Sequence, residues 1–190
     1  MQALNQLLLE RRRKNAENHY FTPSHLVREV MVSDKIRETL LAAKVELYHI
    51  DEAIDVIKNG AWNIFAILIL MKEPQYILNF IKDDHLQRST IDTKLPFELK
   101  KLEELLEDHM LAQDFYDKQW GFTAPFFSSS VFPRILPFDF ILPFLSDEGL
   151  GEGSFGNVYK IQVERSYQQF DREPYHEVSI LVLRIWPVKC

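Results

Sequence analysis

The stretch AWNIFAILILM, residues Ala61–Met71, decides the first part of the fold, because it is apolar on nearly every side apart from Asn63. Eleven residues form about 16 Å of helix, roughly half the thickness of a bilayer. A helix this short and this apolar is typical of the buried centre of a helical domain. We therefore expect a core helix at this position and no membrane span.

The residues on both sides of this core helix predict further helices over 1–120. Ser33 is the expected N-cap of a helix over 34–47, because a serine hydroxyl accepts a hydrogen bond from a free backbone N–H of the first turn. A shorter helix is expected over 51–58. Gly60 is expected to end it, since glycine readily adopts the left-handed conformation found at helix ends.

Pro96 opens the helix with the clearest pattern, which we expect to continue unbroken to Trp120. Its apolar side chains recur at steps of three and four residues, the spacing of a single helix face, and charged side chains fill the other face. Lys100 and Glu104 are four residues apart and can form an ion pair, although in the less favourable orientation for a helix. The expected buried face comprises Leu99, Leu102, Leu105, Leu106 and Met110.

The segment from Gly121 to Leu145 has a different composition, with four prolines and seven phenylalanines. Repeated proline excludes a regular helix, because proline lacks the backbone N–H and clashes with the preceding turn. So many phenylalanines are too apolar for a free linker. We expect an extended strap over 121–145 whose rings dock onto neighbouring surfaces.

From Ser146 onward the pattern becomes that of β-structure. Residues 149–156 hold four of the six glycines and predict a turn-rich segment, and β-prone residues follow over 158–163 and again over 179–186. The sequence therefore predicts an α+β fold: a mainly α-helical N-terminal domain over 1–120, the strap, and a short antiparallel β segment over 146–190.

Composition narrows the classes of function. The formal net charge is −6, from 22 basic and 28 acidic residues, so the chain has no general attraction for nucleic acid. Cys190 is the one cysteine, which excludes an internal disulfide and a cysteine-based zinc site. The histidines lack metal-ligand spacing, so we expect no metal site. No G-x-S-x-G motif is present, so we expect no hydrolase nucleophile. Without a secretory signal or a membrane span, we expect an intracellular protein, cytoplasmic or nuclear.

One motif carries chemistry, namely G-x-G-x-x-G-x-V over 151–158. Glycines at this spacing allow backbone N–H groups to approach phosphate oxygens without a clash from Cβ atoms. A dinucleotide-binding loop with this pattern must open a helix. The third glycine here leads instead into Asn157–Val163, which is strand-like, so we expect a strand–glycine loop–strand hairpin.

The segment LGEGSFGNVYK, Leu150–Lys160, resembles the glycine-rich loop of a eukaryotic protein kinase. The stretches Asp114–Trp120 and Val131–Leu145 also resemble the N-terminal extension of a group of fungal protein kinases. The resemblance implies an ATP-binding hairpin with Phe155 at its tip and with Leu150 and Val158 against the base. The nucleotide-binding residues that it implies are Leu150, Gly151, Glu152, Gly153, Ser154, Phe155, Gly156, Asn157, Val158 and Arg184.

The same resemblance requires a lysine on the next strand, and Arg184 occupies that position in ILVLR. Lys189 is the alternative, but its use would bring Pro187 into the strand. The kinase catalytic loop and metal-binding motif are absent, so we expect a truncated kinase-like protein that is inactive as given. ATP binding is expected to be weak, with Mg²⁺ only if the missing part exists. The alternative is a non-catalytic helical module that binds a protein partner and carries a vestigial kinase segment.

Overall fold

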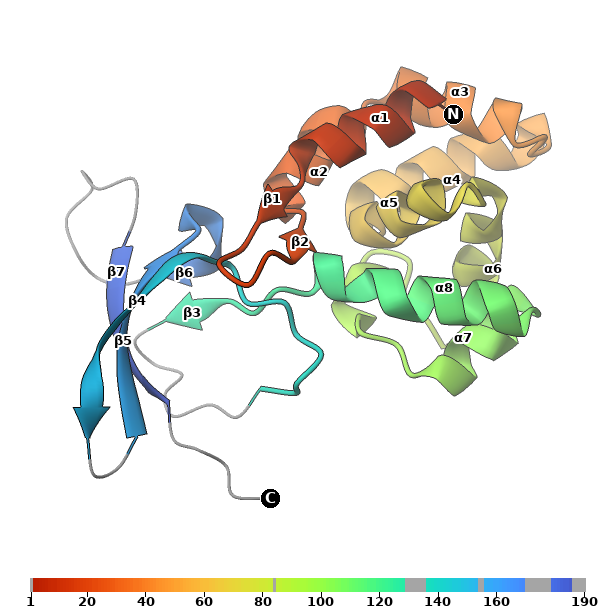
Figure 1. The fold of residues 1–190 in the computed structure, drawn as a ribbon. Coiled ribbons are helices and arrows are strands. Elements are labelled where there is room, and N and C mark those ends of the chain that lie inside the picture. The colour runs from red at the N-terminus through yellow and green to blue at the C-terminus, as the bar shows by residue number, and fades with distance from the viewer. Residues whose placement is uncertain (1, 84, 129–135, 154–155, 170–178, 186–190) are drawn as a thin grey trace. The chain divides into compact units, whose positions relative to one another are not determined.

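The computed structural model describes residues 2–83, 85–128, 136–153, 156–169 and 179–185. The chain forms two compact units (Figure 1). The first, called here the helical unit, comprises Met1–Arg12 and Thr22–Thr123. The second, called here the β unit, comprises Arg13–Phe21 and Ala124–Cys190. The predicted α+β, mainly helical fold is confirmed.

The helical unit is an array of short helices around one central helix, α5. As predicted, α5 is the most buried, and every side chain from Ile64 to Ile69 is fully shielded from solvent. The α-helices of the helical unit are α1 (Gln2–Arg11), α2 (Ser24–Val30), α3 (Ser33–Ala42), α4 (Leu47–Gly60), α5 (Trp62–Met71), α6 (Ile77–Lys82), α7 (Leu99–Leu106) and α8 (His109–Gln119), with 3-10 turns at Pro74–Tyr76, Ile91–Lys94 and Trp120–Phe122.

Within the described residues, no single helix is both long enough and apolar enough to cross a membrane. The pair formed by α4 and α5 reaches the required length and composition together, but the two helices are bent by 117° at their junction. Both contribute most of their apolar side chains to the core of the helical unit.

The predicted helix over 97–120 is wrong in one respect, because it is broken into α7 and α8. Glu107 has a left-handed backbone, with a φ of 54°, and ends α7. Asp108 then caps α8, since its Oδ1 accepts a hydrogen bond of 2.9 Å from the backbone N–H of Leu111. The break turns Met110 out of the predicted buried face, and its side chain is 75% exposed.

Two boundaries before the core helix also differ from the prediction. Helix α3 stops at Ala42 and not at 47, because Lys44 takes a left-handed conformation with a φ of 61°. Ser33 is the first residue of α3, and Val32 occupies the N-cap position. Gly60 is the last residue of α4, and its role is a close approach: a Cβ atom there would lie 2.3 Å from the backbone carbon of Ser89.

The β unit contains an antiparallel three-stranded sheet, in the order β4-β5-β7, and two small strand pairs. The long strand β4 begins inside the predicted strap and runs through the glycines from Gly149, which the sequence had placed in a turn. The strands are β1 (Arg13–Lys14), β2 (Tyr20–Phe21), β3 (Phe127–Ser128), β4 (Phe144–Gly153), β5 (Gly156–Val163), β6 (Gln168–Gln169) and β7 (Ser179–Ile185); β1 pairs antiparallel with β2, and β3 pairs parallel with β6.

The predicted strap contributes two of its rings to the core of the β unit. Phe127 and Phe144 are buried, and their ring centroids lie 5.4 Å apart. Phe138 is fully exposed, and Phe132 lies outside the described residues. The core of the β unit comprises Phe21, Phe127, Phe144, Ile161, Val163 and Tyr167.

Candidate functional site: the glycine-rich hairpin

The G-x-G-x-x-G motif lies at the closed end of the β4–β5 hairpin. Gly153 of β4 pairs with Gly156 of β5, and Glu152 pairs with Asn157. Ser154 and Phe155, between the two strands, lie outside the described residues. The third glycine of the motif therefore begins a strand, and this is the strand–glycine loop–strand arrangement expected from the sequence.

The glycines of β4 leave its backbone uncovered. Built at Gly149 or Gly151, a Cβ atom would have no other heavy atom within 4 Å. The pairing register shifts between these two residues, which marks a β-bulge, and Gly151 has a φ of 157° that side-chain-bearing residues rarely adopt. A phosphate oxygen could thus approach the backbone at Gly151, the first glycine of the motif, closely, since no Cβ atom is present there and no described neighbour occupies its place.

Three of the predicted nucleotide-binding residues lie in one row across the sheet. Val158 on β5 is the register partner of Gly151 on β4, and it is also the register partner of Arg184 on β7. Leu150, next to Gly151, is exposed. The structure therefore places Arg184 on β7, the strand next to β5, and β5 carries the last glycine and the valine of the motif. The alternative, Lys189, lies outside the described residues.

Polar contacts across the hairpin hold its register. Lys160 Nζ lies 3.5 Å from Glu148 Oε2, and these residues are also backbone register partners. The Ser146 hydroxyl and Gln162 Oε1 lie 3.1 Å apart in the same way. Both pairs are exposed, so each contributes at most about 1 kcal/mol to the hairpin. Packing at the end of the hairpin away from the glycines must therefore supply most of the stability of β4 and β5.

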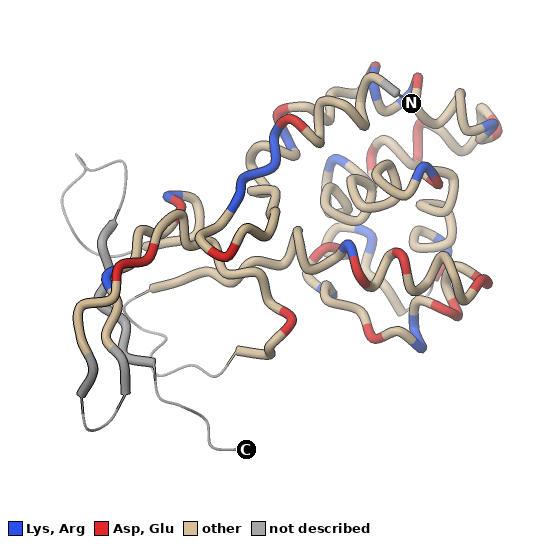
Figure 2. Tube along the Cα trace, viewed as in Figure 1, with Lys and Arg blue, Asp and Glu red and all other residues tan. Residues whose placement is uncertain are grey.

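Among the described residues, no group of three or more His, Cys, Asp or Glu side chains could hold a metal ion. Basic and acidic residues are interspersed along the helices of the helical unit (Figure 2). One run of basic residues stands out at the end of α1 and in β1, formed by Arg11–Lys14. Arg11 in this run is paired with Glu29 at 3.5 Å.

Among the described residues, the carboxyl with a raised pKa is Asp92, in the helical unit. Burial raises the pKa of Asp92 to about 6, although hydrogen bonds from backbone N–H groups act in the opposite direction. Its Oδ2 accepts from Asn63 N at 2.8 Å, and its Oδ1 accepts from Ile64 N at 3.0 Å. Asp92 thus caps the free N–H groups of α5. The sequence analysis did not identify this role, because 28 residues separate Asp92 from Ile64 and no local pattern links them.

Comparison of the chain with protein-family models, with curated proteins and with solved structures gave no match. The residues of the hairpin and their geometry are therefore the basis for assigning a function.

Proposed function

We propose that the β4–β5 hairpin binds the phosphates of ATP, in the manner of the glycine-rich loop that it resembles, within an intracellular protein-kinase-like protein. The observation that supports this most directly is the pairing of Gly153 with Gly156 at the closed end of an antiparallel hairpin. Backbone N–H groups beside glycines can bind an anion without help from side chains. Arg184, on the strand beside Val158, would supply a cation for the same phosphates.

The expected affinity is low. Strand β4 is exposed from Ser146 to Gly151, so the described residues of the hairpin would contact only one side of a bound nucleotide. A site that covers only one side of a ligand buries little of its surface, and affinity falls accordingly. We expect a dissociation constant of about 1 mM, which corresponds to about −4 kcal/mol.

The direct test is a titration of the full chain with ATP, followed through the amide signals of β4 and β5 by nuclear magnetic resonance. Gly153→Val should abolish the saturable shifts, because the new side chain would occupy the path of the phosphates. Gly149→Val is the matched control: it changes the same strand outside the motif, where an added Cβ meets no neighbouring atom. Equal binding by both variants, or no saturation in the parent chain, would contradict the proposal.

Phosphoryl transfer is a separate question with its own assay. A kinase needs a catalytic base and metal ions that neutralise the phosphates. We expect the 190-residue chain to bind ATP without transferring phosphate to protein substrates in the presence of Mg²⁺. Phosphate incorporation that copurifies with the chain and disappears in Gly153→Val would show instead that the chain is an active enzyme.

A second candidate function, a module that binds a protein partner, is favoured by exposed apolar side chains on two helices of the helical unit. Leu41 near the end of α3 and Leu47 and Tyr48 in the first turn of α4 are all exposed, and Tyr48 is 75% exposed. Large exposed apolar side chains are common at interaction surfaces. If this function is the relevant one, Tyr48→Ser should abolish partner binding and Gly153→Val should leave it intact.

A further inference from the structure

The segment Arg13–Phe21, called here the N-terminal clasp, belongs to the β unit although the residues before and after it belong to the helical unit. The sequence had placed it within the helical domain over 1–120. It forms a small hairpin in which β1 pairs with β2, Arg13 being opposite Phe21 and Lys14 opposite Tyr20. The chain therefore leaves the helical unit after Arg12 and re-enters it at Thr22.

The polar end of the clasp binds the chain at the start of β4. Asn15 is buried, and its Nδ2 donates a hydrogen bond of 3.1 Å to the carbonyl oxygen of Leu142. The next residue, Ala16, donates its backbone N–H to the carbonyl oxygen of Phe144 at 2.7 Å. Asn15 also closes the turn of the clasp, because its Oδ1 accepts from the backbone N–H of His19 at 2.8 Å.

The apolar end of the clasp completes the core beneath the same strands. Phe21 is 0% exposed, and its ring meets that of Tyr167 edge to face, with centroids 5.8 Å apart. It packs in one cluster with Phe144 of β4 and Ile161 of β5. A buried phenylalanine removes roughly 150–250 Å² from water. Among the described residues, Phe21 is one of six buried members of this core.

We propose that the N-terminal clasp orders the glycine-rich hairpin and is therefore a positioning element for ATP; the part concerning ATP rests on the proposed function. Strand β4 is exposed from Ser146 to Gly151, and exposed polar pairs connect it to β5. A sheet of three strands is marginal in water without a packed face. The clasp supplies this support at the base, through two hydrogen bonds to the chain at the start of β4 and one buried ring.

The test is amide hydrogen exchange on the full chain, without ATP, comparing Asn15→Ala with Asn5→Ala. Asn5 is a matched control, because its Nδ2 donates an equivalent bond of 2.9 Å to a backbone carbonyl, that of Ile69, inside the helical unit. Loss of Asn15 should accelerate exchange in β4 and β5 by roughly 5- to 30-fold and leave α4 and α5 unchanged. Asn5→Ala should leave β4 and β5 unchanged.

A milder substitution at the other end of the clasp keeps the proposal testable if Asn15→Ala fails to fold. Phe21→Leu keeps an apolar side chain but loses the ring, and it should accelerate exchange in the same two strands. Unchanged exchange in β4 and β5 for this variant, or equal acceleration in both units, would overturn the ordering role of the clasp.

A separate arm with ATP distinguishes this inference from the proposed function. At five times its dissociation constant, ATP should slow exchange in β4 and β5 of the parent chain by about sixfold. Failure of this slowing, with the effect of Asn15→Ala intact, would refute ATP binding and leave the clasp as an ordering element. Slowing by ATP with no effect of either clasp variant would refute the clasp alone.

Discussion

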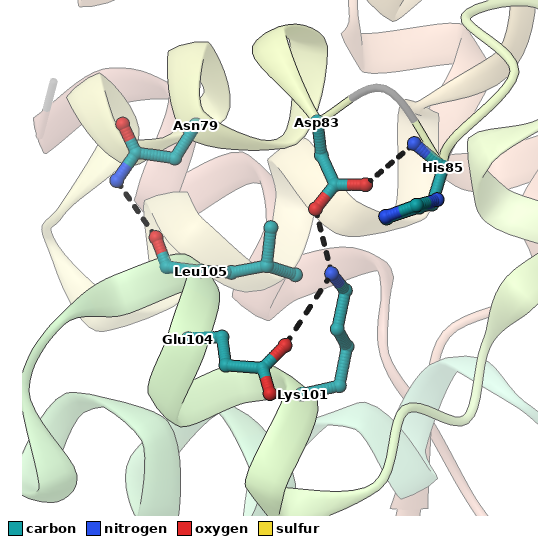
Figure 3. Close-up of polar contacts among 6 residues, drawn as sticks. All are labelled: Asn79, Asp83, His85, Lys101, Glu104 and Leu105. Atoms are coloured by element: carbon teal, nitrogen blue, oxygen red, sulfur yellow. Dashed lines mark hydrogen bonds and ion pairs between the residues drawn. The ribbon is translucent and has the colours of Figure 1, made fainter.

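Lys101 on α7 donates a hydrogen bond of 2.6 Å from Nζ to Oδ2 of Asp83, the residue that follows α6 (Figure 3). The same ammonium group lies 3.6 Å from Glu104. The sequence analysis had paired Glu104 with Lys100 instead. Because Asp83 and Lys101 are both partly buried, this pair ties α6 to α7 more firmly than two exposed charges would.

We expect Lys101→Met to lower the free energy of unfolding by about 1 kcal/mol at pH 7. The hydrogen bond from Lys101 is the main cause that holds the pKa of Asp83 below its ordinary value. An acid with a depressed pKa stabilises the fold above its unfolded pKa, and this stability is lost as the pH falls through its folded value. Urea unfolding of the parent chain and the variant should therefore converge below pH 4.

Lys100→Met is the control for this prediction, because Lys100 is exposed on the same helix. It should change stability by no more than about 0.5 kcal/mol. A larger loss for Lys100→Met than for Lys101→Met would mean that the pairing expected from the sequence is the correct one.

Asp92 should give the opposite dependence on pH. Its pKa is raised to about 6 in the folded chain, chiefly by burial, from an ordinary value of 3.8. The folded state therefore holds this proton more tightly than the unfolded state does. The contribution is fully present below pH 4 and is lost as the pH rises through 6. The stability of the parent chain relative to Asp92→Asn should decrease between these pH values; an unchanged difference would exclude the shift.

Asp92→Ala tests the capping role directly. It leaves the backbone N–H groups of Asn63 and Ile64 without their carboxylate acceptor. We expect a loss of about 1–2 kcal/mol in urea unfolding at pH 7, the usual cost of losing a helix cap. A neutral result would show that water replaces the carboxylate at no cost.

Leu102→Ala should destabilise the helical unit by about 2–5 kcal/mol, because Leu102 is 0% exposed and its removal leaves a cavity. Met110→Ala should be nearly neutral, since the break between α7 and α8 leaves Met110 exposed. Thermal or urea unfolding followed by circular dichroism at 222 nm measures both. Similar costs at the two positions would indicate one continuous helix, as the sequence predicted.

Gly60→Ala should cost about 1–3 kcal/mol, because the added Cβ would collide with the backbone of Ser89 and force it to move. Gly149→Ala should be nearly neutral, since its Cβ would meet no atom within 4 Å. If Gly60 only ended a helix, alanine would be tolerated there at a much smaller cost. Unfolding of the two variants in urea separates these explanations.

The fold class, the core helix and the glycine hairpin could all be predicted from local patterns. Ala61–Met71 is apolar on nearly every face apart from Asn63, and a short helix of this kind is typically buried. The strand after Gly156 followed from β-prone residues that alternate with polar ones. These properties lie within a few neighbouring residues, so no knowledge of distant parts of the chain was needed.

Features that depend on contacts between distant residues could not be predicted. The break at Glu107 and Asp108 lies inside an apolar pattern that continues in sequence, and only the direction of α8 shows that Met110 leaves the core. In the sequence, Asp92 is one polar residue among several, and its capping role is evident only from its hydrogen bond to the N–H group at the start of α5. Both features depend on how one secondary-structure element packs against another.

The sequence by itself determined the helical core and the strand that follows the glycine motif, because side-chain periodicity and glycine spacing are patterns within a few neighbouring residues. Only the tertiary structure decided that Phe21 joins the core beneath the hairpin with Tyr167, 146 positions further along the chain (167 minus 21). A single aromatic residue gives no local signal of its partner, since burial in a shared core is set by the packing of the whole unit.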